Sequence, residues 1–408
     1  MKKYLILLLF LMILHVPAST CTVAIISGKH TPDGRPILWK HRDTGTLDNK
    51  VVFFNGGPYQ AVGLVNSAEE GLEDGDPEKA WIGFNEEGFA IMNSASYNLI
   101  EEDTVQMPHL EGAVMRDALA NCATVDEFEQ YLKDLPKPMG LETNFGVIDA
   151  EGNAAFFETD HFSHTRIDVD DKSVAPHGYI VRSNYSFTGQ AGEGAGYIRF
   201  ETAERLFYRA SAADELSIPH LMENIATSVW NSYSEQDARN AIHMSETESK
   251  YMYFHDCINR YSSSSSVAIQ GVKEGESPDL TTMWSLLGFP LGSVALPVWI
   301  TPEQTLPSIM TAPDKENAPL CDWSLTLKEE MIPSRRGSTQ YYIDAVKVFN
   351  ADHTGITQRL IPVSREVIRE TRELMEDWQQ PPQEAVNAHY DWIDRYITNT
   401  YQELFDIP

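Results

Sequence analysis

An apolar run at the start of this chain ends shortly before a cysteine, and this junction decides how the remaining sequence is interpreted. The run extends unbroken from Tyr4 to Leu14, lysines precede it, and small residues lead from it to Cys21. This order is typical of a secretion signal. The run is shorter than the about 20 apolar residues that a membrane-spanning helix needs, and no later stretch is long enough. We therefore expect residues 1–20 to be a signal peptide and the protein to be exported, periplasmic or extracellular, without a membrane span.

A cysteine at the end of a signal has three chemical fates. Its sulfur can be lipidated, which would make the chain a lipid-anchored binding protein modified at Cys21. It can join a disulfide. Or Cys21 can become the N-terminus, which places a thiol and an α-amine on one residue. Ala18 and Thr20 occupy places where lipoprotein signals prefer leucine and then glycine or alanine. The free N-terminal cysteine is therefore favoured, although Thr20 is not ideal for ordinary signal cleavage either.

Composition excludes several classes of protein. The chain has 408 residues, is 42% hydrophobic, which suffices for a substantial core, and carries a net charge of −29, which repels nucleic acid and anionic membranes. Its cysteines are too few for a disulfide scaffold. Apart from Cys21 they are Cys122, Cys257 and Cys321, which allow at most one bridge among them, and the sequence does not choose the pair. The scattered histidines lack metal-ligand spacing, so we expect neither a metal nor another cofactor.

The residues after the junction predict a hairpin. Segment 21–27 alternates and is rich in β-branched residues, 31–34 has the composition of a turn, and 36–39 resumes a strand that leads to Asp43. Such a hairpin would return Asp43 to the neighbourhood of Cys21.

Further along, strand-like and helix-like segments alternate in blocks. This arrangement favours an α+β fold of layered sheets over a doubly wound parallel sheet. Strands are predicted at 51–54, 80–84, 89–93, 144–148, 154–158, 178–182, 266–270, 296–300 and 341–349. Helices are predicted at 110–135, with a break and a cap near Thr124, at 199–210, 218–229, from about Val363 to 378, and on to 404 beyond Pro381 and Pro382.

An N-terminal cysteine suits the cleavage of an amide. The thiolate is the attacking species, and a free cysteine has a pKa of about 8.5. An α-amine has a pKa of about 7.7–8.0, so it can take the thiol proton near neutral pH and return it to the leaving amine. The intermediate then needs hydrogen-bond donors aimed at the developing oxyanion. Candidates for the supporting roles are Asp43, Asn93, Asn184 and Arg199, although each alone also fits a structural role at a strand end or helix start.

At these residues the sequence resembles the cysteine branch of the N-terminal nucleophile (Ntn) hydrolases. That group contains choloylglycine hydrolases, penicillin V acylases and acyl-coenzyme A:6-aminopenicillanic acid acyltransferases, which act on linear amide C–N bonds. The resemblance covers about residues 21–210. It rests on Cys21-Thr22, Asp33-Gly34 and Asp43, on 83–90, which is similar to a "G-x-N-E-x-G-L" hairpin followed by Asn93, on Arg182-Ser183-Asn184, similar to "R-T-N", and on Tyr197-Ile198-Arg199-Phe200, similar to "S-x-R-F".

The resemblance implies a four-layer αββα sandwich, and a hydrolase that forms a thioester between Cys21 and the acyl group of a small, non-peptide amide. It implies that Asp43 is the catalytic aspartate, that Asn93 and Asn184 form the oxyanion hole, and that Arg199 lies beside the nucleophile. It also implies that Cys21 can expose itself by self-cleavage. An acyltransferase, in which an amine replaces water as the acceptor, is the alternative within this fold.

One position departs from the family's pattern. Relatives often carry an arginine three residues before the aspartate, where this chain has Lys40, while Arg42 directly precedes Asp43. A lysine cannot make the bidentate contact of a guanidinium, so Lys40 acts as a simple charge, Arg42 takes its place, or the role is absent. We divide the chain into the signal at 1–20, an Ntn-hydrolase domain at 21–350 and a helical extension at 351–408. We expect this extension to pack onto its own domain, with self-association into a homo-oligomer as the alternative.

Overall fold

The structure is a computed structural model that describes residues 20–67, 79–100, 105, 109–312, 317–333 and 337–407. The expected signal at 1–20, apart from Thr20, lies outside these residues. Within the described residues, no helix combines the length and the apolar character that crossing a membrane requires.

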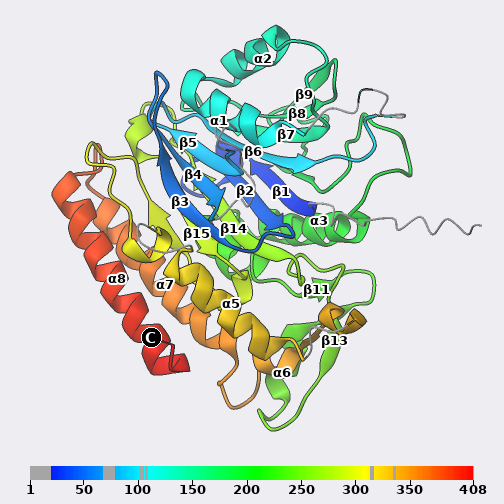
Figure 1. Cartoon of the computed structure of the whole chain (residues 1–408), viewed down its shortest axis with the longest axis vertical. Helices are drawn as coiled ribbons and strands as arrows, with labels where there is room; N and C mark the ends of the chain where they lie inside the picture. Colours follow the sequence, from blue (N-terminus) through cyan, green and yellow to red (C-terminus); the bar gives the residue numbers. More distant parts are fainter. Residues whose placement is uncertain are drawn as a thin grey trace, which may run out of the picture.

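A six-stranded antiparallel sheet carries the start of the described chain (Figure 1). Its strands, in spatial order, are β10 (Tyr179–Arg182), β1 (Thr20–Ile26), β2 (Ile37–Asp43), β14 (Ser263–Gln270), β15 (Thr282–Leu287) and β16 (Leu296–Val298). The predicted hairpin is confirmed as β1 and β2, in which Thr20 lies opposite Asp43 and Cys21 lies opposite Arg42. Gly34 turns the chain between the two strands with a φ of +77°, a conformation that glycine adopts without strain.

A second antiparallel sheet follows the chain as a meander. Its seven strands are β3 (Asn49–Phe54), β4 (Ala61–Asn66), β5 (Ile82–Asn85), β6 (Ala90–Ala95), β7 (Thr143–Ile148), β8 (Ala154–Thr159) and β9 (His164–Asp168). Between β6 and β7 the chain forms α1 (Glu111–Asn121) and α2 (Val125–Asp134). The predicted break between these helices is confirmed, because the hydroxyl of Thr124 accepts the backbone N–H of Glu127 and the Glu127 carboxylate accepts that of Ala123.

Three apolar clusters join these elements. Between the two sheets, Val23 and Leu38 pack in one cluster with Val62, Met92 and Phe156. On the other face of the six-stranded sheet, α3 (Tyr197–Ala212) packs against Trp39 and its neighbours. On the other face of the seven-stranded sheet, α1 and α2 pack against β6 and β7. The molecule is thus a mixed α/β fold with antiparallel sheets, as expected.

The C-terminal helices belong to the same core as the sheets. They are α5 (Pro319–Met331), α7 (Ile356–Met375) and α8 (Gln383–Phe405), which lie side by side in Figure 1. Their residues Leu360, Val367, Ile393 and Tyr401 are buried in the cluster that contains Val23. The shorter elements are α4 (Ile218–His220), α6 (Ala345–Val348), β11 (Trp230–Asn231), β12 (Gln236–Asp237), β13 (Tyr251–Tyr253) and β17 (Tyr342–Asp344).

Three predicted elements differ from the structure. The strand predicted at 341–349 ends at Asp344, because its carboxylate accepts the backbone N–H of Val346 and starts α6 there. In place of the helix predicted at 218–229, the chain forms α4 and then a π-helical turn from Leu221 to Ile225. After this turn the Thr227 hydroxyl donates to the backbone carbonyl of Glu223. The helix predicted from about Val363 already begins at Ile356, with Pro362 inside it.

Candidate active site

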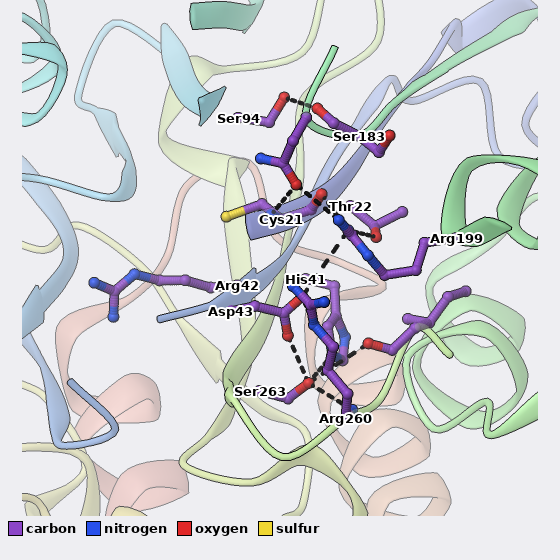
Figure 2. Close-up of polar contacts among 12 residues, drawn as sticks. Cys21, Thr22, His41, Arg42, Asp43, Ser94, Ser183, Arg199, Arg260 and Ser263 are labelled. Atoms are coloured by element: carbon purple, nitrogen blue, oxygen red, sulfur yellow. Dashed lines mark hydrogen bonds and ion pairs between the residues drawn. The ribbon is translucent and has the colours of Figure 1, made fainter. Parts of the chain in front are cut away.

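Cys21 lies near the start of β1 and is held by both of its backbone groups (Figure 2). Its nitrogen donates to Asn184 Oδ1 at 3.0 Å, and its carbonyl oxygen accepts from Arg199 Nη1 at 2.7 Å. The residue is 3% exposed. Since Thr20 still precedes Cys21 in this chain, the nitrogen is a peptide nitrogen here. The contacts therefore fix the backbone at the bond whose cleavage would create an α-amine.

Arg199, in the first turn of α3, connects three groups of this site. Besides the Cys21 oxygen it donates from Nη1 to Thr22 Oγ1 at 2.9 Å and from Nη2 to Asn184 Oδ1 at 2.8 Å. Burial, together with the positive charge of Arg260, lowers the pKa of Arg199 to about 10, which leaves it charged at neutral pH. Gly196, the residue directly before the helix, has a φ of +84°, and a Cβ there would lie 2.3 Å from Arg199 Nη2. Glycine at this position therefore makes room for the guanidinium.

Asp43, the last residue of β2, is fully buried between two arginines. Its Oδ2 accepts from Arg260 Nε at 2.9 Å and lies 4.0 Å from Arg199 Nη1, and its Oδ1 accepts from the Ser263 hydroxyl at 2.7 Å. The hairpin register brings Asp43 to the Cys21 end of β1, as predicted. Sequence reasoning missed Arg260 and Ser263, which no motif marks and which approach only because β14 pairs with β2.

The two predicted asparagines occupy different contacts. Asn184 Nδ2 donates to the carbonyl of Ala95 at 2.9 Å while its Oδ1 faces the Cys21 nitrogen. Asn93, on β6, accepts from Lys40 Nζ at 2.7 Å through Oδ1 and donates from Nδ2 to Thr143 Oγ1 at 3.2 Å. Asn184 thus touches Cys21 directly, and Asn93 belongs to a second group of contacts around Lys40. The oxyanion role stays a prediction for both.

Lys40 is buried on the same face of β2 as Arg42, the cross-strand partner of Cys21. Its Nζ donates to the Trp81 carbonyl at 2.9 Å in addition to Asn93. Burial lowers the pKa of Lys40 to about 8, against an opposing effect of Cys21. The ammonium group of Lys40 therefore binds Asn93 and the Trp81 carbonyl, and it loses its proton near physiological pH.

Arg42 has contacts away from Asp43. Its guanidinium lies 4.7 Å from the Trp81 ring centre, and its Nη2 donates to Asn66 Oδ1 at 2.8 Å. Figure 2 shows the side chain extending away from the Asp43 carboxylate. Among the contacts described, the guanidinium nearest to Asp43 is that of Arg260. The roles of Lys40 and Arg42 stay predictions.

The four cysteines, all within the described residues, are buried and unbridged. Burial raises the pKa of Cys122, Cys257 and Cys321, so these thiols are poor nucleophiles. In the described part of the chain, no group of three or more histidine, cysteine, aspartate or glutamate residues could hold a metal ion.

Comparison with known proteins places this chain in a family. The sequence model of the acyl-coenzyme A:6-aminopenicillanic acid acyl-transferase family matches residues 80–285, which is half of the 408-residue chain. No curated protein matches the sequence.

Among solved structures, a variant of conjugated bile acid hydrolase from Clostridium perfringens is similar at 13% identity and a TM-score of 0.41, over 70% of this chain and 94% of that one. Penicillin V acylase from Agrobacterium tumefaciens is similar at 13% identity and a TM-score of 0.35, over 69% and 86%. The Caenorhabditis elegans ortholog of N-acylethanolamine-hydrolyzing acid amidase is similar at 14% identity and a TM-score of 0.35, over 49% and 87%.

Proposed function

Because this chain belongs to the acyl-coenzyme A:6-aminopenicillanic acid acyl-transferase family, we propose that it is an exported hydrolase that cleaves the C–N bond of a small N-acyl substrate with Cys21 as its nucleophile. The observation that carries the proposal is the binding of both backbone groups of Cys21, the nitrogen by Asn184 and the oxygen by Arg199. Buried backbone groups need partners in any fold, but at Cys21 both partners are polar side chains that distant segments of the chain bring to this one residue. The four-layer Ntn sandwich is part of the proposal, supported by helices on the outer faces of both sheets.

Removal of the residues before Cys21 would turn its nitrogen into an α-amine. Asn184 Oδ1 already accepts an N–H from this nitrogen, so it would hold the neutral amine by one hydrogen and leave the lone pair for the thiol proton. The thiolate then bonds to the substrate's carbonyl carbon, the C–N bond breaks, and the ammonium returns its proton to the leaving amine. Water next attacks the thioester, gives a proton to the α-amine, and releases the acid and the thiol.

The supporting residues have separate parts in this proposal. Arg199 and Asp43 place the cysteine backbone and balance the charges beside it. Asn93 supplies an oxyanion donor, because Lys40 occupies its Oδ1 and thereby fixes which end of the amide carries the N–H groups. Lys40 thus acts on the reaction through Asn93, as a charge and not as a bidentate partner.

The test uses protein secreted from the full chain and a panel of N-acyl amino acids, bile-acid conjugates, penicillin V and β-alanyl amides. We expect the wild type to release free amine from at least one of them, and Cys21→Ala to stay folded and lose at least about 1,000-fold in rate. N-terminal sequencing should find Cys21 first. Full activity in Cys21→Ala would refute the proposal, and a diacylglyceryl mass on Cys21 would show a lipid-anchored protein instead.

Acyl transfer to an amine is the second candidate, favoured by the activity for which the matched family is named. The same thioester forms, and the nitrogen of a second amine replaces the water oxygen. Adding amines to the hydrolysis assay separates the two activities. If the chain is a transferase, new amides should form at the expense of free acid, and if it is a hydrolase the product should stay free acid.

A further inference from the structure

A buried chain of hydrogen bonds leads away from Asp43 on the face of β2 opposite to Lys40 and Arg42. His41 Nε2 lies 3.0 Å from the Ser263 hydroxyl oxygen, and that hydroxyl donates to Asp43 Oδ1 at 2.7 Å. All three side chains are fully buried. Neither His41 nor Ser263 belongs to the motifs that the sequence marks.

The direction of these bonds follows from the atoms that take part. A serine hydroxyl has one hydrogen and two lone pairs. Asp43, which faces two guanidinium groups, takes the hydrogen of Ser263 at 2.7 Å, because the other acceptor in reach, the Ile258 carbonyl oxygen, lies farther away at 3.5 Å. The backbone N–H of Arg260 donates to one lone pair of Ser263 at 3.0 Å. The other lone pair must therefore accept from His41, which fixes His41 as the tautomer that carries its hydrogen on Nε2.

The remaining ring nitrogen of His41 supports this assignment. His41 Nδ1 is buried and finds no hydrogen-bond partner among the described residues. Burial also lowers the pKa of His41 to about 4, so the ring is neutral at physiological pH and keeps a single hydrogen. A buried acceptor without a partner destabilises a fold, so an imidazole is a poor choice for packing alone. What the imidazole provides at this position is the Nε2–H that it donates to Ser263.

We propose that His41 and Ser263 are positioning residues for the Asp43 carboxylate, and through it for Cys21; this inference rests on the proposed hydrolase. Ser263 fixes Oδ1 while Arg260 fixes Oδ2, so the carboxylate cannot rotate. Its Oδ2 then faces Arg199, which binds the Cys21 carbonyl and Asn184. His41 keeps the Ser263 hydroxyl turned towards Asp43, because the hydroxyl cannot donate to a nitrogen that carries its own hydrogen.

The experiment compares His41→Gln with His41→Leu in the processed, full-length protein, on a substrate for which wild type and Cys21→Ala already differ. The amide nitrogen of glutamine can stand in for Nε2 and donate to Ser263, whereas leucine cannot. We expect His41→Leu and Ser263→Ala to lower kcat by about 10- to 100-fold with little change in KM, as groups that orient a functional side chain do elsewhere. We expect His41→Gln to stay within about 5-fold of wild type, by the same reasoning. Should His41→Leu not fold, His41→Asn replaces it, because its shorter amide cannot reach Ser263.

Ser324→Ala is the matched control. Ser324 is a fully buried serine on α5 whose hydroxyl accepts from the backbone N–H of Phe289 at 3.0 Å and donates to the Cys321 carbonyl at 2.8 Å, without contact to Asp43 or His41 among the interactions described. It should lower the melting temperature as Ser263→Ala does but leave kcat within about 2-fold, as expected of a site independent of Asp43. Equal loss of kcat in both serine variants, an unchanged kcat in Ser263→Ala, or a His41→Gln as slow as His41→Leu would overturn the proposal.

A second readout separates failure of this inference from failure of the proposed function. Alkylation of Cys21 by iodoacetamide, followed by peptide mass, needs no substrate. If no amide is cleaved even by the wild type, the proposed function fails, and the inference is judged on alkylation alone. A slower Cys21 alkylation in His41→Leu that His41→Gln restores would still support it, and identical rates in all variants would overturn it.

Discussion

Two groups of buried contacts lie on opposite faces of β2, and they differ in the interactions that hold them together. We call the first the Asp43 group: Asp43, Arg199, Arg260, Ser263 and His41, which reach the site from β2, from α3 and from around the start of β14. The second is the Lys40 group, which consists of Lys40, Asn93, Trp81 and Thr143 on the strands of both sheets and the loop before β5.

The difference lies in charge and in titration. The Asp43 group surrounds one carboxylate with two arginines, and its histidine is neutral across the physiological range, so its hydrogen bonds do not change near pH 7. The Lys40 group depends on one ammonium whose pKa is lowered to about 8. In the proposed reaction, the first group would therefore hold Cys21 in the same way at every pH near 7, while the second would make the Asn93 side of the site sensitive to pH.

Breaking the Asp43 group at Arg199 should have the largest effect. Arg199→Ala removes the donors to the Cys21 carbonyl, to Thr22 and to Asn184, and it leaves buried acceptors without their cation. Removing one partner of a buried charge cluster costs about 3–5 kcal/mol, so we expect a melting temperature lower by several degrees and a loss in kcat of at least about 1,000-fold. Differential scanning calorimetry and amide hydrolysis measure the two effects.

Arg209→Ala serves as the control for this change. Arg209 lies on the same helix and stacks on the Trp230 ring at 4.6 Å, away from Cys21. It should leave kcat unchanged within about 2-fold, because surface substitutions away from such clusters have small effects. A kcat of wild-type size in Arg199→Ala would show that the contacts to the Cys21 backbone do not matter for the reaction.

Breaking the Lys40 group should have a smaller effect that depends on pH. As the pH rises through about 8, Lys40 loses the charge that binds Asn93 Oδ1, so the wild-type kcat should decline in alkaline solution. Lys40→Met should lower kcat by about 10- to 100-fold, the loss expected for a group that orients a functional side chain. Lys40→Arg cannot titrate in this range, so its kcat, whatever its size, should show no decline near pH 8. A decline at the same pH in Lys40→Arg would assign it to another group, such as the α-amine of Cys21.

The same contrast explains how much could be predicted from the sequence. Cys21, Asp43, Asn184 and Arg199 were found because a strand, a hairpin register and a helix start place them, and local patterns specify such elements. Their contacts in the structure agree with the predicted proximity, while their catalytic roles stay predictions. Arg260 and Ser263 were missed because their approach depends on the pairing of β14 with β2, more than 200 residues apart, which no local pattern specifies.

His41 was available from the sequence but was not recognised. It shares a strand face with Asp43 by simple alternation, but the strand was predicted only over 36–39, so the residues that follow were not assigned to a face. The fold shows the same division between local and distant information. Paired hairpins such as β7 and β8 were predicted, whereas β4, β15 and α5 were not, because their sequences lack clear alternation or a helical stripe and become regular only when packed between neighbours.

The dependence of the free energy of unfolding on pH should give the most detailed distinction between the two groups. The folded pKa of His41 is about 4 against 6.5 for a free histidine, so between these values the unfolded chain binds a proton that the folded chain does not. Stability is therefore lost as the pH falls from 6.5 towards 4, by on the order of 3 kcal/mol for this group. His41→Gln should remove this part of the slope. Since His389 on α8 also has a pKa lowered to about 4, the comparison is made in a His389→Gln background.

Lys40 should change the stability of the protein at alkaline pH, and in the same direction as His41 does at acid pH: stability rises as the pH rises. The folded pKa of Lys40 is about 8 against 10.5 for a free lysine, so between these values the folded chain has released a proton that the unfolded chain keeps. Stability should therefore rise with pH from 8 to 10.5, again by on the order of 3 kcal/mol, and Lys40→Met should flatten this rise while leaving the acid window unchanged. Urea unfolding at a series of pH values measures both windows. If His41→Gln altered the alkaline window, or Lys40→Met the acid one, the two groups would be coupled through Cys21 and the separation argued above would not hold.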